Sequence, residues 1–368
     1  MKKSIIKLLK VLASIIATLF LAIVVFIFFT GPQLPENTDQ LIENVVQSEP
    51  PEFVKGTADY VISDSLKIWY ECISPEDSIK GNVLLFMGIS NDAMGWPPEF
   101  LKLLVDSGYR VIRYDYRSTG MSDWIEDYQK SPFSLRDLGK DAVTILDTLK
   151  IQKAHLVGVS LGGMVAQDFA IFYPERTSSL SSIMSSGNII DPELPGISKT
   201  TILKLIKIGI RYNIIKNEKN TIKLNLTART ILRGSSLNEK DIKEISEQVL
   251  YNMRKRNGYN IKSSEQHQAA TLQSGSRYDK LKNINIPILL IHGEKDPLIP
   301  IEHSKKLASI IPHAKTRWFQ GLGHDIPHEY TDSVSNELIA HFGRIRNKVT
   351  SKNPNFFVTQ IFQNTHLQ

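Results

Sequence analysis

The feature that most constrains the fold is a glycine-flanked serine at a change of secondary structure. The sequence Gly-Val-Ser-Leu-Gly occupies residues 158–162, after the apolar run 154–157 and before a helix-like stretch, 163–173. A strand-to-helix turn of this kind strains the backbone of its serine and points free helix N–H groups at whatever the serine contacts. The glycines are expected because side chains there would collide with the neighbouring strand and helix. Ser160 is therefore a candidate nucleophile.

A base and an orienting acid for this serine are expected further along the chain. Asp296 follows residues 287–293, an apolar run expected to be a buried parallel strand, and would stand at the carboxyl end of that strand. His324 closes a glycine-rich loop after a short strand expected at 316–319. The loop would bring the imidazole back over the sheet, so that Ser160, Asp296 and His324 form a nucleophile, acid and base.

Each of these assignments has an alternative. Asp296, which precedes Pro297, also suits a turn or the N-cap of a helix near 302–310. His324 also suits a surface loop, and Glu294 is the second candidate acid. We expect Asp325 to be solvated rather than catalytic, and we expect structural roles for two strand-end histidines, His155 and His292.

Two backbone N–H groups are needed to stabilise a developing oxyanion. Leu161, directly after the serine, is expected to supply the first. The second is expected in the loop after the apolar run 83–86, where Ile89, or Gly88 beside it, is the candidate. A glycine there lets the backbone approach a substrate oxygen, and it also suits a plain strand end.

These motifs resemble the α/β-hydrolase superfamily, and within it the branch of aclacinomycin methylesterase-like esterases. Besides the serine motif, the resemblance rests on the stretches 87–97 and 108–122, and it covers about Thr57–Gly343. It implies hydrolytic chemistry with the chain order nucleophile, acid, base. Met87 stands where the family usually has a loop histidine, which bears on substrate class, and Ser118 stands where many relatives have glycine.

Short apolar runs alternate with amphipathic segments, which predicts an α/β fold with a mainly parallel sheet covered by helices on both faces. Residues 54–70 are expected to add antiparallel strands at the sheet edge. The resemblance implies a helical cap where the alternation stops. The expected organisation is a membrane anchor at 1–30, a linker at 31–56, an α/β-hydrolase domain at 57–345 with a cap at about 188–285, and a C-terminal tail at 346–368.

The first part of the cap, from 202 to 223, mixes Ile and Leu with Lys at helical spacing. A helix of this composition usually buries its apolar side against the core and leaves its lysines in water. The alternative is a basic amphipathic cap that contacts lipid headgroups and brings a lipid-like ester to Ser160.

The N-terminus carries a segment that suits a transmembrane helix. Val11–Phe29 contains no charged residue over 19 positions, enough to cross a hydrocarbon core of about 30 Å at about 1.5 Å per residue. Lysines precede this segment and acidic residues follow it, so we expect a cytoplasmic N-terminus and an extracytoplasmic hydrolase domain. A cleaved signal peptide is the alternative, but the end of the run lacks the small residues of a cleavage site.

Several functional classes are excluded by composition and motifs. The single cysteine, Cys72, excludes an internal disulfide and a thiolate metal cluster, and we expect it to be buried in a strand. The net charge of +6 is accompanied by no nucleic-acid-binding motif, phosphate-binding glycine loop or HExxH metal motif. We therefore expect no metal, cofactor or nucleic-acid partner.

The sequence thus predicts a membrane-anchored serine hydrolase that cleaves a small-molecule carboxylic ester, or a related acyl substrate, through an acyl-enzyme. Cofactor-free haloperoxidases or perhydrolases, and C–C or amide hydrolases, would use the same fold. A catalytically inactive membrane-tethered binding protein is a possibility of a different class.

Overall fold

The computed structural model describes residues 2–352 and has an eight-stranded sheet at its centre. The spatial order of the strands is 1-2-4-3-5-6-7-8, with the first two pairs antiparallel and the others parallel. The expected mainly parallel sheet with an antiparallel edge is confirmed. The strands are β1 (Thr57–Ser63), β2 (Leu66–Ile73), β3 (Gly81–Phe86), β4 (Tyr109–Tyr114), β5 (Ala154–Val159), β6 (Thr177–Ile183), β7 (Ile288–Gly293) and β8 (Lys315–Phe319).

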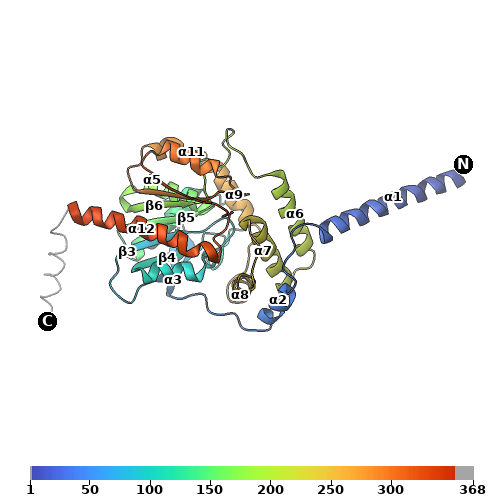
Figure 1. Ribbon diagram of the computed structural model, residues 1–368, viewed down its shortest axis with the longest axis horizontal. Coiled ribbons are helices and arrows are strands. Elements are labelled where there is room, and N and C mark those ends of the chain that lie inside the picture. Colours follow the sequence, from blue (N-terminus) through green and yellow to red (C-terminus); the bar gives the residue numbers. More distant parts are fainter. Residues whose placement is uncertain (1, 353–368) are drawn as a thin grey trace.

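Helices cover both faces of this sheet (Figure 1). An apolar cluster on one face joins the sheet to α3 (Pro98–Asp106) and α12 (His328–Lys352). A second cluster joins the other face to α4 (Leu135–Thr148), α5 (Leu161–Phe172) and α11 (Glu302–Ile310). Burial on both faces explains why β3, β5 and β7 are mostly apolar, whereas β6 fills its buried positions largely with serine.

The helical insertion expected between β6 and β7 is present. It contains α6 (Lys199–Asn213), α7 (Glu218–Arg233), α8 (Glu239–Lys255), α9 (Ser263–Ser274) and α10 (Tyr278–Lys282). The middle helices have clear local boundaries, because Asn217 and Asn238 cap the N-termini of α7 and α8 and Gly234, with φ of 79°, ends α7. Figure 1 shows α6, α7 and α8 together at one end of the domain.

The N-terminal helix α1 (Lys2–Phe29) projects away from the domain (Figure 1). Its segment Ile5–Phe29 is long and apolar enough to cross a membrane, a property that signal sequences share. The segment expected as a linker contains α2 (Thr38–Val46), whose Ile42 packs in an apolar cluster with residues of α7 and α8. The chain between α1 and the sheet is therefore docked on the cap.

Three smaller features complete the fold. Two short 3-10 helices lie at Ala93–Gly95 and Pro174–Arg176. Cys72 is half-buried on β2, so the expectation of a buried cysteine is wrong. The expected tail begins inside α12, and residues 353–368 lie outside the described part of the chain.

Candidate active site

Ser160 lies on the sharp turn between β5 and α5. Its backbone has φ of 57° and ψ of −123°, a sparsely populated conformation for a residue with a side chain. Two contacts brace the turn: the Ser160 N–H donates to the Ile183 carbonyl at 2.9 Å, and the Ser185 hydroxyl donates to the Ser160 carbonyl at 2.6 Å. The strain predicted for this serine is therefore present and is held by the next strand, β6, and the loop after it.

The two glycines of the motif are required by close backbone approach. A Cβ atom on Gly158 would lie 2.1 Å from the Gly162 carbonyl oxygen, and one on Gly162 would lie 1.9 Å from the Phe86 carbonyl oxygen. Backbone atoms cannot move aside as the end of a flexible side chain can. The turn, β3 and α5 can pack this tightly only without side chains at both positions, as the sequence predicts.

We expect Gly162→Ala to lower the free energy of unfolding by about 3 kcal/mol or more, because the new methyl group would force β3 and α5 apart. Denaturant titration of the full chain in mild detergent would measure this change. Gly209→Ala is the matched control: Gly209 lies in α6 with no atom within 4 Å of the added Cβ. The control is expected to stabilise the helix by about 0.5–1 kcal/mol. Equal effects of the two substitutions would contradict this role of Gly162.

The structure brings Ser160, Asp296 and His324 together. Asp296 follows β7, and His324 lies in the loop between β8 and α12. His324 Nε2 lies 2.9 Å from Ser160 Oγ, and His324 Nδ1 lies 2.6 Å from Asp296 Oδ2. The imidazole is thus held between a hydroxyl and a carboxylate, and residues far apart in the sequence meet at the carboxyl ends of the strands.

The cap also positions the histidine. The His324 N–H donates to the Leu232 carbonyl at 2.7 Å, and the Gly323 N–H donates to the Arg233 carbonyl at 3.1 Å. Both acceptors lie in the last turn of α7, whose carbonyl groups have no partner within the helix. The C-terminus of α7 therefore fixes the loop that carries the imidazole.

Asp296 is buried and is held in its ionised form. Burial alone would raise the pKa of this carboxyl, but the charge of His324 and hydrogen bonds from His324 and His292 outweigh burial and hold the pKa well below its usual range. Its Oδ1 accepts hydrogen bonds from the Leu298 and Ile299 N–H groups, both at 2.8 Å. Oδ2 remains directed at the imidazole of His324.

His292 takes part in this arrangement, which the sequence did not reveal. Its Nε2 lies 3.3 Å from Asp296 Oδ2 and 2.8 Å from the Ile299 carbonyl oxygen, while its Nδ1 lies 2.6 Å from Ser304 Oγ. His292 therefore orients the carboxylate in addition to its structural role. His292 and Asp296 are four positions apart across the end of β7, and this short separation is the sequence signal that could have suggested their contact.

Glu294, the second candidate acid, does not join this group, because its side chain is exposed. His155 is buried beside Ser179 and stacks on Phe342, in agreement with a structural role. The expectation that Asp325 is solvated is wrong, because it is largely buried between Arg229 and Arg233 of α7, at 3.2 Å and 3.4 Å.

A cavity of about 210 Å³ opens beside Ser160 and His324. Gly88 and Ile89, from the loop after β3, line one side, and α7 lines another with Asn225, Ala228, Arg229 and Leu232. Leu161 begins α5, so its N–H has no acceptor within the helix. Both candidate oxyanion donors thus belong to segments that border the serine.

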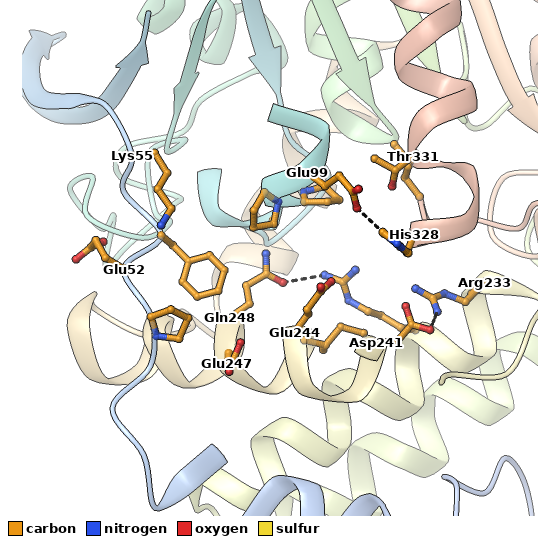
Figure 2. A pocket seen from close by; sticks show the side chains of 18 residues that line it. Glu52, Lys55, Glu99, Arg233, Asp241, Glu244, Glu247, Gln248, His328 and Thr331 are labelled. Atoms are coloured by element: carbon orange, nitrogen blue, oxygen red, sulfur yellow. Dashed lines mark hydrogen bonds and ion pairs between the residues drawn. The ribbon is translucent and has the colours of Figure 1, made fainter. Parts of the chain in front are cut away.

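A second cavity, of about 350 Å³, adjoins the first between α3, α8 and residues 51–55. Figure 2 shows Glu99 turned toward His328 and Asp241 toward Arg233, so that ion pairs occupy part of its wall. The two cavities share the lining residues Gly95, Pro97, Arg229 and Ile326. These shared residues therefore lie between the second cavity and the one beside the serine.

Within residues 2–352, no group of three or more His, Cys, Asp or Glu side chains is placed to hold a metal ion. The polar groups around Ser160 instead suit proton transfer and nucleophilic attack, because a hydroxyl, an imidazole and a carboxylate follow one another at hydrogen-bond distance.

The chain belongs to the alpha/beta hydrolase fold family, whose model matches residues 81–330. It is a serine hydrolase of this fold, similar in sequence to methylesterases. Rhodomycin D methylesterase DnrP of Streptomyces peucetius is 26% identical over 76% of this chain and 96% of that protein. A 2-hydroxy-6-oxononadienedioate/2-hydroxy-6-oxononatrienedioate hydrolase of Paraburkholderia phymatum is 28% identical over 72% of this chain and 88% of that protein. The expected resemblance to methylesterases is thereby confirmed.

Solved structures show the same fold. An esterase from Exiguobacterium antarcticum superimposes with a TM-score of 0.62 at 20% identity, over 78% of this chain and 100% of that chain. A bacterial membrane phospholipase A superimposes with a TM-score of 0.60 at 18% identity, over 94% of this chain and 100% of that chain. At these identities the likeness concerns the fold alone.

Proposed function

We propose that this protein is a membrane-anchored carboxylic-ester hydrolase in which Ser160 is the nucleophile, His324 the general base and Asp296 the residue that orients the base. The observation that carries the proposal is the imidazole held at 2.9 Å from the serine hydroxyl and 2.6 Å from the carboxylate. A serine hydroxyl is a weak nucleophile at neutral pH, and an adjacent base of this geometry activates it.

The reaction has two steps. His324 Nε2 takes the proton of Ser160 as Oγ attacks the ester carbonyl, and it then gives that proton to the leaving alcohol, leaving an acyl group on Ser160. Water then attacks the acyl group while it loses a proton to the same nitrogen, and His324 returns that proton to Ser160 Oγ as the Oγ–acyl bond breaks and the acid is released. The ionised Asp296 stabilises the positive imidazolium in both steps, in keeping with a pKa held low.

The negative charge that develops on the carbonyl oxygen is met by two backbone N–H groups, those of Leu161 and Ile89. Leu161 offers the free N–H of a helix start, and Ile89 lies in the loop that lines the cavity. A Cβ atom on Gly88 would lie 3.6 Å from the Ser160 Cβ, so this loop passes close to the serine. The closeness supports the pair as an oxyanion hole.

A small-molecule ester is the substrate class that the relatives favour, since two of them are named rhodomycin D methylesterases. Hydrolysis of a C–C bond is the second candidate, because further relatives at 26–28% identity are named 2-hydroxy-6-oxononadienedioate hydrolases. Arg229 lines the cavity but is paired with Asp325 at 3.2 Å, so an acidic substrate of that kind would meet a cation whose charge is already partly neutralised.

The proposed organisation places residues 1–30 in the membrane and residues 57–345 in the hydrolase domain, with the cap at about 188–285. Support comes from the apolar length of α1, and from the lysines that precede it and favour a cytoplasmic N-terminus. The hydrolase domain then lies on the extracytoplasmic side.

Labelling by a fluorophosphonate probe tests the proposed nucleophile. The full chain in mild detergent is expected to become labelled, and Ser160→Ala is expected to remain unlabelled, because the probe reacts with an activated serine. A series of p-nitrophenyl esters of increasing chain length would then measure the preferred acyl group. Absence of labelling in a folded chain would favour an inactive binding protein on this fold instead.

A further inference from the structure

An exposed apolar stripe runs along α6, the outermost helix of the cap. Ile202, Ile206 and Ile210 of α6, and Ile214 directly after its end, recur every four residues and are between 40% and 65% exposed. This spacing places them on one side of the helix. Outside α1, thirteen large apolar side chains are exposed among the described residues, and six of them lie between 202 and 215. A soluble surface scatters such side chains singly, so a concentration of this kind marks a contact surface.

The helix that carries the stripe contacts the C-terminal end of α1. Lys207 of α6 places its Nζ 4.2 Å from the centre of the Phe26 ring and 2.5 Å from the Thr30 hydroxyl, both at the end of α1. Figure 1 shows α6 crossing the base of α1, from which α1 extends away from the domain. If α1 spans the bilayer, the exposed side of α6 therefore lies where α1 enters the headgroup region.

The charge of α6 matches an anionic surface. Between Ser198 and Glu218 the chain carries basic residues and no acidic residue. Lys204 is exposed and Arg211 is half-buried on α6, and Lys216 is exposed just beyond its end. An amphipathic helix with apolar residues on one face and Lys or Arg beside them is the type that lies in the plane of an anionic membrane interface.

We propose that α6 is an interfacial helix whose isoleucine stripe is inserted in the headgroup region of an anionic bilayer leaflet beside α1. This inference rests on the proposed membrane anchor. The opposite side of α6 packs on α7, which lines the cavity at Ser160, so contact with the bilayer holds the cap in a fixed place above the leaflet. The cap is then attached to the membrane at two places, α1 and α6.

Site-specific labelling tests the contact. In a Cys72→Ser background, Ile206→Cys in the full chain carries an NBD fluorophore, and the protein is reconstituted in nanodiscs of phosphatidylcholine and phosphatidylglycerol. Ile62→Cys on the edge strand β1, 61% exposed, is the matched control. Doxyl-labelled lipid is expected to quench the label at 206 about threefold or more above the control, as for a side chain in the acyl boundary.

Equal quenching at the two positions would overturn the inference. A different result would also overturn it: a label at 206 that aqueous iodide does not quench and doxyl-labelled lipid does not quench, together with cross-linking between two copies of the chain. A second copy, and not lipid, would then cover the stripe. A second variant, Ile206→Glu with Ile210→Glu, is expected to remove quenching of a label placed at Ile202→Cys.

Two further measurements keep the proposals separate. The intact mass of the chain recovered from membranes checks the anchor, since a chain beginning near Gly31 would mean that α1 is cleaved. Hydrolysis of a water-soluble short-chain p-nitrophenyl ester checks the proposed function, and it is expected to be unchanged in the Ile206→Glu, Ile210→Glu variant. If the label at 206 is not quenched while the original chain still hydrolyses the ester, the interfacial helix is refuted and the proposed ester hydrolase is not.

Discussion

Turnover of an ester substrate is expected to fall by about a millionfold when Ser160 is replaced by alanine, because the acyl-enzyme can no longer form. His324→Ala is expected to cost a similar factor, since the hydroxyl without its base is a weak nucleophile. The double variant is expected to be no slower than either single variant, because the two residues act as one unit. Initial rates with a p-nitrophenyl ester measure all three.

The control for this prediction is Ser181→Ala. Ser181 is a buried serine on β6 whose hydroxyl has no hydrogen-bond partner among the described residues, so its removal breaks no hydrogen bond there. The control is expected to retain the parent rate. A Ser160→Ala protein with a rate within about tenfold of the parent would refute the nucleophile assignment, since about 10⁶ is expected when a nucleophile is removed.

The second large effect concerns Arg256, the residue that follows α8. Its guanidinium is buried between two carboxylates: Nε lies 2.9 Å from Asp92 Oδ2, and Nη2 contacts Asp115. Asp92 follows β3 and Asp115 follows β4, so this one side chain joins the cap to two loops of the sheet. Burial and the charge of Asp92 raise the pKa of Asp115 to about 7, against the opposing effect of Arg256.

Arg256→Met is expected to lower the free energy of unfolding by about 3–5 kcal/mol, because it leaves two buried carboxylates without their cation. The loss should grow with pH. An Asp carboxyl with a folded pKa above its ordinary value of 3.8 contributes stability below about pH 4 and loses it as the pH rises through about 7. Removing the guanidinium raises the folded pKa further and so enlarges this loss.

Denaturant titrations at pH 5 and pH 8 in mild detergent would measure the effect of Arg256→Met. Lys255→Met is the matched control, because Lys255 is a neighbouring cation whose side chain is 50% exposed and whose ion-pair partner within residues 2–352 is the exposed Glu49, at 3.3 Å. The control is expected to change stability by less than about 1 kcal/mol at either pH. An Arg256→Met protein as stable as the control would refute this role of Arg256.

Much of the site could be predicted because its signals are local. The flanking glycines and the change from strand to helix identify Ser160, and a strand followed by a short loop identifies both Asp296 and His324. The substitution of Met87 for the family's loop histidine was equally visible. The contact between Met87 and Gly95, eight positions later in the chain, was not visible: a Cβ atom on Gly95 would lie 2.8 Å from the Met87 side chain.

The expectations that were wrong or incomplete all depended on distant contacts. Asp325 was expected to be solvated, but α7, about a hundred positions earlier, places two arginines against it. His292 was expected to be structural, although the turn after β7 brings it to 3.3 Å from Asp296. The linker at 31–56 gave no sign that Ile42 would pack on the cap.

The sequence by itself determined the alternation of strands and helices, the strained serine turn, the chain order of the three site residues and the apolar length of the N-terminal helix. Backbone sterics and the periodicity of apolar residues act over a few positions, so a single sequence displays them. Only the tertiary structure decided which charges meet around Arg256 and Asp325, how α7 holds the His324 loop, and which face of α6 is left exposed beside α1. Helical periodicity shows that a face is apolar, but what covers that face depends on contacts between elements that are distant in the chain.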